Sequence, residues 1–316
     1  MDIKQKSSHL QSTYTVVGTL GDGHFGTVYK AVRKQTGEVV AIKRLKQKSN
    51  FASMEDCVNT VSEVKIQTNL GIHLNIIQLR YVFQESGYLH MVMDYMESNL
   101  LQVFVCRKTS GIFFPESQIR DFCFQLLKGL DYIHSHGYMH RDLKPENVLA
   151  TGNQLKIADF GLAREVSPYA KYTDYVTTRW YRAPEVLLGG ENYGAAVDMW
   201  ALGAIIAEMY LLRPLFLGRN MFHQLAQICN IMGTPSQKDW PLGHQLAATR
   251  AVHFPRNKGV DLARLIPAAS ESAIHLMYSL LSWDPKKRIT ARKALEHPFF
   301  KDHFQPHTIS PLTSSR

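Results

Sequence analysis

The first part of the chain alternates apolar and polar positions in short runs. Between Tyr14 and Leu45, β-branched residues alternate with polar ones, and Gly and Asp residues interrupt the runs. This pattern predicts three antiparallel strands. A helix is expected from Glu55 to Leu70, followed by short strands at residues 77–83 and 88–94.

After Met96 the apolar positions recur at helical spacing. One helix is expected between a start signal at Pro115 and Glu116 and a stop signal at Gly137. Further helices are expected at residues 195–212, 221–232, 270–282 and 290–296. Because 316 residues exceed what one core usually supports, two lobes are expected. The sequence therefore predicts an α+β fold: a small antiparallel sheet lobe at residues 14–94, a larger, mainly helical lobe at 95–300, and loosely ordered polar tails at 1–13 and 301–316.

Charge and cysteine content change this picture little. The formal net charge is +9, but the basic residues are scattered and match no nucleic-acid-binding module, so no nucleic-acid partner is expected. The four cysteines show no metal-like spacing and are expected to be reduced thiols. The N-terminus carries no signal-peptide pattern, and no apolar run is long enough for a membrane helix. We expect a soluble, intracellular chain without membrane insertion, in the cytoplasm, the nucleus or both.

Two motifs in the first lobe suggest a phosphate site, although each has an alternative. Gly21, Gly23 and Gly26 form a GxGxxG pattern, which also marks dinucleotide sites. Dinucleotide sites need a helix after the glycines, whereas the following VYKAV predicts a strand and favours a hairpin over phosphates. Lys43 ends the strand-like run VAIK, and taken alone it could simply extend into solvent.

Three further motifs lie in the second lobe. The stretch from His140 to Asn147 places Asp142, Lys144 and Asn147 within one short loop. Asp159 follows a short strand and precedes Phe-Gly, and an Ala-Pro-Glu triplet ends at Glu185. Each motif alone could belong to a surface loop.

Together, the five motifs resemble eukaryotic protein kinases in order and approximate spacing, over residues 14–300. The resemblance implies a bilobal kinase fold, with ATP as co-substrate and Mg²⁺ as cofactor. It implies that Lys43 neutralises the α- and β-phosphates and pairs with Glu63, since Glu55 lies too close to Lys43 in sequence. Asp142 would orient the substrate hydroxyl and accept its proton, Lys144 would hold the γ-phosphate, and Asn147 and Asp159 would ligate Mg²⁺.

The same resemblance implies an adenine site and two structural anchors. The residues expected to contact ATP, besides Lys43, are Leu20, Gly21, Gly23, Gly26, Val28, Ala41, Met93, Asp94, Met96 and Leu149. Met93 would guard the back pocket, while Asp94 and Met96 would offer backbone groups. Asp198 would cap the catalytic-loop backbone, and Glu185 would pair with Arg288.

The segment from Tyr172 to Glu185 resembles the group of cyclin-dependent and mitogen-activated kinases, and most closely the male-germ-cell-associated and ciliogenesis-associated kinase family. This implies activating phosphorylation of Thr173 and Tyr175 by an upstream kinase. Arg141 and Arg164 would clamp the phosphate on Thr173, and Arg179 and Arg182 would face that on Tyr175. The Asp-Leu-Lys-Pro-Glu-Asn loop implies Ser/Thr substrates, and the group implies proline after the phosphoacceptor. A monomer is expected. Location in a cilium or flagellum is an expectation from the family alone. The group also has an insertion at residues 213–267, which is expected to serve as a docking surface.

Two residues depart from the family pattern. Ser62 precedes Glu63 where the family has arginine, with Lys65 as a point charge nearby. Gln67 stands where the family has an apolar side chain, so either the amide finds a partner or the helix sits differently. We hypothesise that phosphorylation of Thr173 is coupled more weakly to this helix than in relatives. The alternatives to an active kinase are a pseudokinase, a dehydrogenase and a nucleic-acid-binding protein, and the presence of Lys43, Asp142, Asn147 and Asp159 argues against the first.

Overall fold

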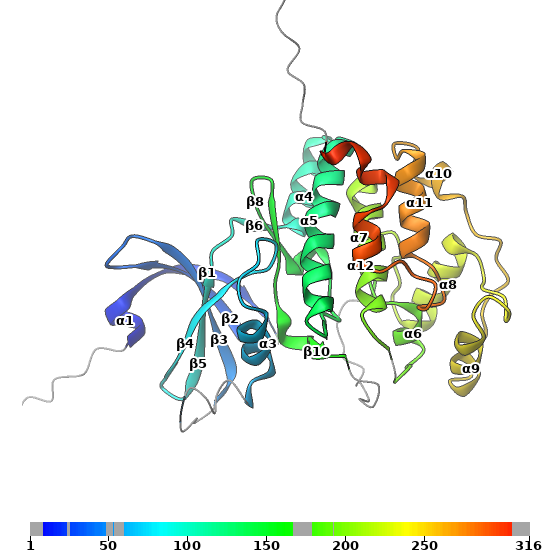
Figure 1. Cartoon of the computed structure of the whole chain (residues 1–316). Coiled ribbons are helices and arrows are strands. Elements are labelled where there is room, and N and C mark those ends of the chain that lie inside the picture. The colour runs from blue at the N-terminus through cyan, green and yellow to red at the C-terminus, as the bar shows by residue number, and fades with distance from the viewer. Residues whose placement is uncertain are drawn as a thin grey trace, which may run out of the picture.

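The computed structural model describes residues 9–23, 26–48, 53, 60–166, 179–191 and 193–304. Over this part of the chain, the strands of the first lobe lie at one end and the helices of the second at the other (Figure 1). The expected α+β architecture, a small antiparallel sheet beside a larger helical lobe, is confirmed.

The first lobe is built on an antiparallel five-stranded sheet of order β1-β2-β3-β5-β4. Its strands are β1 (Tyr14–Asp22), β2 (Gly26–Arg33), β3 (Val39–Lys48), β4 (Leu79–Glu85) and β5 (Tyr88–Asp94). The helix α3 (Ser62–Leu70) covers the sheet on the side of the second lobe (Figure 1), with Val64 packed against Leu89 and Met91. The expected helix at 55–70 is thus observed over its second half, and Glu55 lies outside the described residues.

The N-terminal segment differs from its expected loose tail, because residues His9–Thr13 form the short helix α1. Leu10 packs on the outer cluster of the sheet, which contains Tyr14, and the ring of His9 meets Phe83 edge-on. The backbone N–H of Leu10 donates to Glu85. These contacts are made with residues that are distant in sequence. The polar composition of residues 9–13 alone therefore could not predict the helix.

The second lobe is mainly helical, as expected. Its helices are α4 (Leu100–Ser110), α5 (Glu116–Ser135), α6 (Pro184–Leu187), α7 (Ala196–Leu211), α8 (Met221–Met232), α9 (Pro241–Thr249), α10 (Leu262–Leu265), α11 (Glu271–Leu280) and α12 (Ala291–Leu295), with 3-10 turns η1 (Pro145–Asn147), η2 (Phe160–Leu162) and η3 (Pro298–Phe304). Short strands β6 (Ser98–Asn99), β7 (Tyr138–Met139), β8 (Val148–Thr151), β9 (Gln154–Ile157) and β10 (Arg164–Glu165) face the first lobe.

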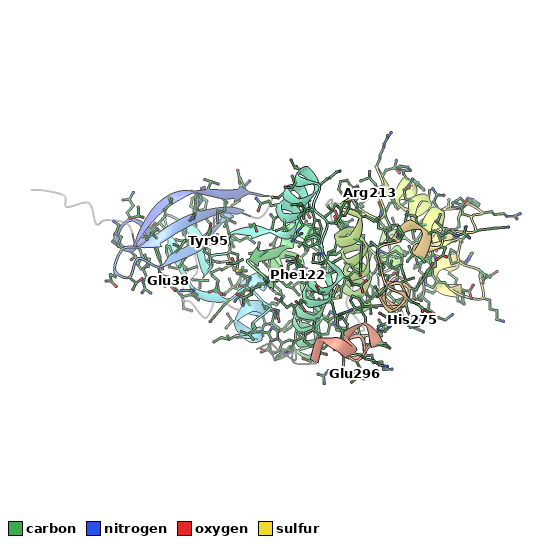
Figure 2. All side chains as sticks on the ribbon, turned by 90° about the horizontal axis from the view of Figure 1, so that it is seen from above. Glu38, Tyr95, Phe122, Arg213, His275 and Glu296 are labelled. Carbon is green, nitrogen blue, oxygen red and sulfur yellow. The ribbon has the colours of Figure 1, made fainter. Side chains whose placement is uncertain are left out.

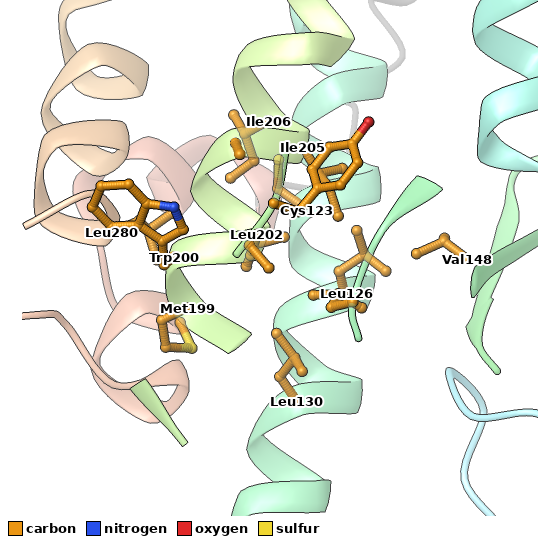
Figure 3. Packing of buried hydrophobic residues seen from close by; sticks show 14 of the residues in the cluster. Cys123, Leu126, Leu130, Val148, Met199, Trp200, Leu202, Ile205, Ile206 and Leu280 are labelled. Atoms are coloured by element: carbon orange, nitrogen blue, oxygen red, sulfur yellow. The ribbon is translucent and has the colours of Figure 1, made fainter. Parts of the chain in front are cut away.

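The core of this lobe forms between α5 and α7 (Figure 3). Every residue of α7 from Val197 to Tyr210 is buried, including the carboxylates of Asp198 and Glu208. Seen from above, Glu38 and Tyr95 lie in the strand-rich lobe and His275 and Glu296 in the helical one (Figure 2). No helix in the described part of the chain has the length and apolar content needed to cross a bilayer.

Candidate active site

A cluster of three charged side chains connects the two lobes. Lys43 on β3 places its Nζ 2.7 Å from Oε1 and 2.9 Å from Oε2 of Glu63 on α3. The same Nζ lies 3.0 Å from Oδ1 of Asp159, just before η2. Lys43 and Glu63 are buried, whereas the Asp159 side chain is 37% exposed. A sheet, a helix and the second lobe therefore meet at one ammonium group.

Electrostatics favour the charged forms of Lys43 and Asp159. Burial alone would lower the pKa of Lys43, but the carboxylates of Glu63 and Asp159 outweigh it and hold that pKa above its usual value. Burial alone would raise the pKa of Asp159, yet the charge and hydrogen bond of Lys43 hold it below its usual value. Burial raises the pKa of Glu63, so the charge of this carboxylate depends on Lys43.

A second polar cluster forms in the loop between β7 and η1. Oδ2 of Asp142 accepts hydrogen bonds from Lys144 Nζ at 2.7 Å and from Asn147 Nδ2 at 3.1 Å. Asn147 Nδ2 also donates to the backbone oxygen of Asp142 at 2.8 Å. The structure thus brings together the three residues that the sequence placed in one loop.

The buried carboxylate of Asp198 on α7 binds the backbone of this loop. Its Oδ2 accepts from the backbone N–H of His140, its Oδ1 accepts from that of Arg141, both at 2.8 Å, and His134 Nε2 lies 2.9 Å from Oδ2. Burial alone would raise the pKa of Asp198, but these hydrogen bonds and His134 hold it below its usual value. The contacts also support a left-handed backbone at Arg141, whose φ is 71°.

His140 connects the loop to Asp159. Its Nε2–H donates to the backbone oxygen of Ala158 at 2.9 Å, and its Nδ1 accepts the N–H of Asp142. Its ring also meets Phe160 edge-on. Asp159 itself has a left-handed φ of 65°. A single buried imidazole therefore positions both the catalytic-loop carboxylate and the segment that carries Asp159.

The glycine-rich turn joins β1 and β2 beside Lys43. The N–H of Gly23 donates to the oxygen of Gly26 at 3.0 Å. A Cβ on Gly26 would lie 2.6 Å from the backbone oxygen of Arg44, so this position requires glycine. Val28 is paired with both Gly21 and Lys43 in the sheet register, which places the backbone of Gly21 and that of Lys43 on either side of Val28.

The expected adenine residues come from both lobes. Ala41 and Met93 are register partners on β3 and β5 and are nearly buried, whereas Leu20 is exposed. Met96 and Leu149 pack partly buried against the large core. The N–H of Asp94 donates to Gln78, and its carboxylate accepts from Arg80 and Lys156. Of the backbone groups of Asp94, the carbonyl is therefore the one that could meet adenine.

The oxygen donors of the site fit a magnesium ion shared with phosphates. Lys43 contacts only Oδ1 of Asp159 within hydrogen-bond distance, and Asn147 uses its Nδ2 for hydrogen bonds, which points its Oδ1 elsewhere. Mg²⁺ prefers one or two protein oxygens together with water and phosphate. Within the described ranges, no three or more His, Cys, Asp or Glu side chains form a group that could hold a metal ion.

The expected pair of Glu185 and Arg288 is present as a two-pronged contact. Arg288 Nη1 and Nη2 donate to the two carboxylate oxygens of Glu185, each at 2.6 Å, and both residues are buried. Arg288 also donates to the backbone oxygens of Ser282, Trp283 and Ala196. This one guanidinium joins α6, the start of α7 and the segment before α12.

Comparisons with known proteins agree with this geometry. Residues 14–300 match the protein kinase domain. The chain belongs to the protein kinase family. It is 49% identical over 289 residues to the human serine/threonine-protein kinase MAK, covering 91% of this chain and 45% of that protein. It is 48% identical over 289 residues to the rat serine/threonine-protein kinase ICK, with the same two coverages.

A plant relative extends the comparison. The chain is 46% identical over 297 residues to cyclin-dependent kinase F-4 of rice (Oryza sativa subsp. japonica), covering 94% of this chain and 63% of that protein. The resemblance to the male-germ-cell-associated and ciliogenesis-associated kinase family, within the group of cyclin-dependent and mitogen-activated kinases, is thereby confirmed. The chain spans about half the length of the MAK and ICK relatives, at 45% of each.

In this kinase domain, the expected phosphosites Thr173 and Tyr175 lie outside the described residues. Of the arginines expected to clamp them, Arg141 donates to the hydroxyl of Tyr193 at 2.7 Å, and Arg164 donates to the backbone oxygen of Ala163. Arg179 and Arg182 are partly buried.

Arg182 lines a pocket with residues of the catalytic loop, the end of the activation segment and α7, namely Arg141, Asp142, Leu143, Lys144, Tyr181, Ala183, Val186, Val197, Asp198 and Ala201. The pocket thus has Asp142 and Arg182 in one lining.

Sequence reasoning missed three residues of the site. Tyr193, which accepts from Arg141, lies outside every motif and could not have been found from spacing. His134 is the second-last residue of α5, and this position gave no signal that it meets Asp198 on α7. His140 belongs to a motif and could have been identified as a bridging residue, because a buried neutral imidazole offers both a donor and an acceptor.

Proposed function

We propose that this kinase domain transfers the γ-phosphate of ATP to serine or threonine hydroxyls of other proteins. The observation that carries the proposal is the meeting of two clusters, Lys43–Glu63–Asp159 and Asp142–Lys144–Asn147, joined through His140. Phosphoryl transfer needs positioning and charge neutralisation more than covalent chemistry. The two clusters supply both. The serine/threonine kinases among the relatives support the same substrate class.

Each residue has a distinct role in the proposed reaction. Lys43, held by Glu63, neutralises the α- and β-phosphates. Asp142 accepts a hydrogen bond from the substrate hydroxyl and takes its proton as the oxygen attacks phosphorus. Lys144, 2.7 Å from Asp142, neutralises the γ-phosphate during transfer. Asp159 and Asn147 would hold Mg²⁺, which supplies charge neutralisation between the phosphates.

The finer features of the function extend this proposal. Substrates carry proline after the phosphoacceptor in this proposal, which follows from the group resemblance of the segment from Tyr172 to Glu185. An upstream kinase phosphorylates Thr173, and the phosphate recruits Arg141 away from the hydroxyl of Tyr193. A phosphate has three strong acceptors and nearly two charges, so it competes well with a neutral hydroxyl.

The test is transfer of labelled phosphate from Mg·ATP to paired Ser-Pro and Ser-Ala peptides. The proposal predicts label on serine, a strong preference for Ser-Pro, and loss of transfer in Asp142→Asn. Transfer to both peptides alike would retain the kinase and remove the proline preference. No transfer after phosphorylation of Thr173 would instead favour a pseudokinase that binds ATP.

A further inference from the structure

Gln67 is a buried polar side chain that finds no hydrogen-bond partner in the part of the chain that the structure describes. Only 4% of the residue is exposed. Neither Oε1 nor Nε2 has a hydrogen-bond partner among the residues that the structure describes. A primary amide can donate two hydrogen bonds and accept two, so its burial in this state is unfavourable. The sequence raised two alternatives, a partner for Gln67 or a displaced helix, and the structure shows neither within the described residues.

The position of Gln67 connects it to the active site. It lies four residues after Glu63 on α3, so the two side chains share one face of the helix. That helix packs against η2, which begins at the fully buried Phe160. On either side of Gln67, Ile66 and Leu70 belong to the large apolar core. The amide therefore enters an apolar environment only when α3 is docked with Glu63 against Lys43.

The other anchors of α3 are unevenly distributed. At its C-terminal end, Asn69 Nδ2 donates to the hydroxyl of Tyr138 at 2.9 Å, and the hydroxyl of Tyr132 donates to the oxygen of Leu70 at 2.6 Å. At its N-terminal end, Val61 provides no side-chain cap, and Glu63 supplies the contact to Lys43. Among the described residues, the N-terminal end is held by this ion pair and by the packing of Val64 on Leu89 and Met91. With its polar anchors concentrated at the C-terminal end, the helix can swing outward about its C-terminus.

We propose that Gln67 is a positioning residue that lowers the docked population of α3, and through Glu63 the fraction of molecules with a correctly placed Lys43. When α3 swings outward, water reaches the amide and satisfies it, so Gln67 favours the undocked state relative to an apolar side chain. An unsatisfied buried polar group shifts such an equilibrium by roughly 5- to 150-fold. The kinetic part of this inference rests on the proposed kinase function, whereas the structural part does not.

The test replaces Gln67 by methionine, which has the same unbranched length and no hydrogen-bonding amide. Thr68→Met is the matched control, because Thr68 is an exposed residue of the same helix. Hydrogen exchange of the α3 amides is measured on the nucleotide-free protein without phosphate on Thr173. We expect about tenfold slower exchange in Gln67→Met and no change in Thr68→Met. Gln67→Leu is a second variant with the same expected direction.

Kinetics provide the second measurement. We expect kcat of the unphosphorylated protein to rise several-fold in Gln67→Met while KM for the peptide stays constant, because only the docked fraction changes. Exchange in Gln67→Met that is equal to or faster than wild type would overturn the inference, as would an equal slowing in Thr68→Met. Slower exchange in Gln67→Met without phosphate transfer in any variant would support the inference and reject the proposed kinase function.

Discussion

Lys43 joins three parts of the fold, namely its own strand β3, the helix α3 and the segment before η2. The sequence paired it with Glu63 by family spacing, and the structure places both carboxylate oxygens of Glu63 within 2.9 Å of its Nζ. The additional contact with Asp159 was not foreseen from the spacing, because the two residues are 116 positions apart in sequence. Contacts between residues so far apart in sequence form only when the two lobes pack together. Local sequence patterns do not predict that packing.

Replacing Lys43 by methionine should remove both activity and stability. Glu63 would stay buried without its counter-charge, and leaving one partner of a buried pair costs about 3 kcal/mol in the free energy of unfolding. Urea denaturation measures this loss, and phosphate transfer should fall by roughly 100-fold or more because the phosphates lose a preorganised charge. Adding Glu63→Gln to Lys43→Met should recover part of the stability and none of the activity. A double variant no more stable than Lys43→Met would contradict this explanation.

At the scale of elements, much of the fold could be predicted. The strand at residues 88–94 and the helix at 221–232 have the expected bounds, because a glycine marks one end of each: Gly87 precedes the strand and Gly233 follows the helix. The helix α1 could not be predicted, since its stability depends on Phe83, Glu85 and the outer face of the sheet. For Gln67, the sequence identified an amide at a position where an apolar residue is expected. Only the structure shows that this amide has no hydrogen-bond partner among the described residues.

The contact between Glu185 and Arg288 links α6 to the segment before α12. Arg288→Lys keeps the charge but loses the two-pronged geometry, and lysine cannot reach all the carbonyls that arginine contacts. We expect a loss of about 3 kcal/mol in the free energy of unfolding, measured by urea denaturation. Arg292→Lys is the matched control: its side chain is 69% exposed and pairs with Asp131 at the surface. That change should leave the free energy of unfolding close to that of wild type, because the pair is exposed to solvent. Equal losses in the two variants would refute the argument.

The glycines near the turn between β1 and β2 lead to a further prediction. Gly26→Ala would place a Cβ 2.6 Å from the backbone oxygen of Arg44, so the β2–β3 pairing must shift. We expect a lower melting temperature and a raised KM for ATP in this variant. A Cβ on Gly21 would meet no neighbouring atom within 4 Å. Gly21→Ala should therefore leave the melting temperature within about one degree of wild type, as expected for an unstrained site. A melting temperature of Gly26→Ala that matches wild type would show that the strands accommodate the methyl group.

At the scale of the whole molecule, Glu208 contributes an unfavourable charge at neutral pH. Burial raises its pKa to about 7, with Glu146 adding to the shift, although the hydrogen bond from Tyr181 at 2.6 Å opposes it. Between the usual glutamate pKa and 7, the folded state binds more protons than the unfolded state, so this group lowers stability as pH rises. Well above pH 7 the cost is complete and amounts to roughly 3 kcal/mol.

Glu208→Gln should therefore be more stable than wild type at pH 8 and closer to wild type at pH 5. Urea denaturation across this range measures the difference between the two proteins. Burial lowers the pKa values of three histidines, so they make the stability of both proteins rise with pH, whereas Glu208 makes it fall; these histidines are His73, His90 and His297. The difference in stability between the two proteins removes this common contribution. A difference independent of pH would show that Glu208 does not titrate in this window.

The most direct test of the account is phosphate transfer by Asp159→Asn, measured with labelled Mg·ATP and a Ser-Pro peptide after phosphorylation of Thr173. Asp159 is the only residue proposed here to contact both Lys43 and the metal. Asp131→Asn, a surface carboxylate paired with Arg292, is the control. We predict that transfer falls by roughly 100-fold or more in Asp159→Asn, as for loss of a major electrostatic contact, and is unchanged in Asp131→Asn. Transfer by Asp159→Asn at the wild-type rate would contradict the proposed arrangement of the site.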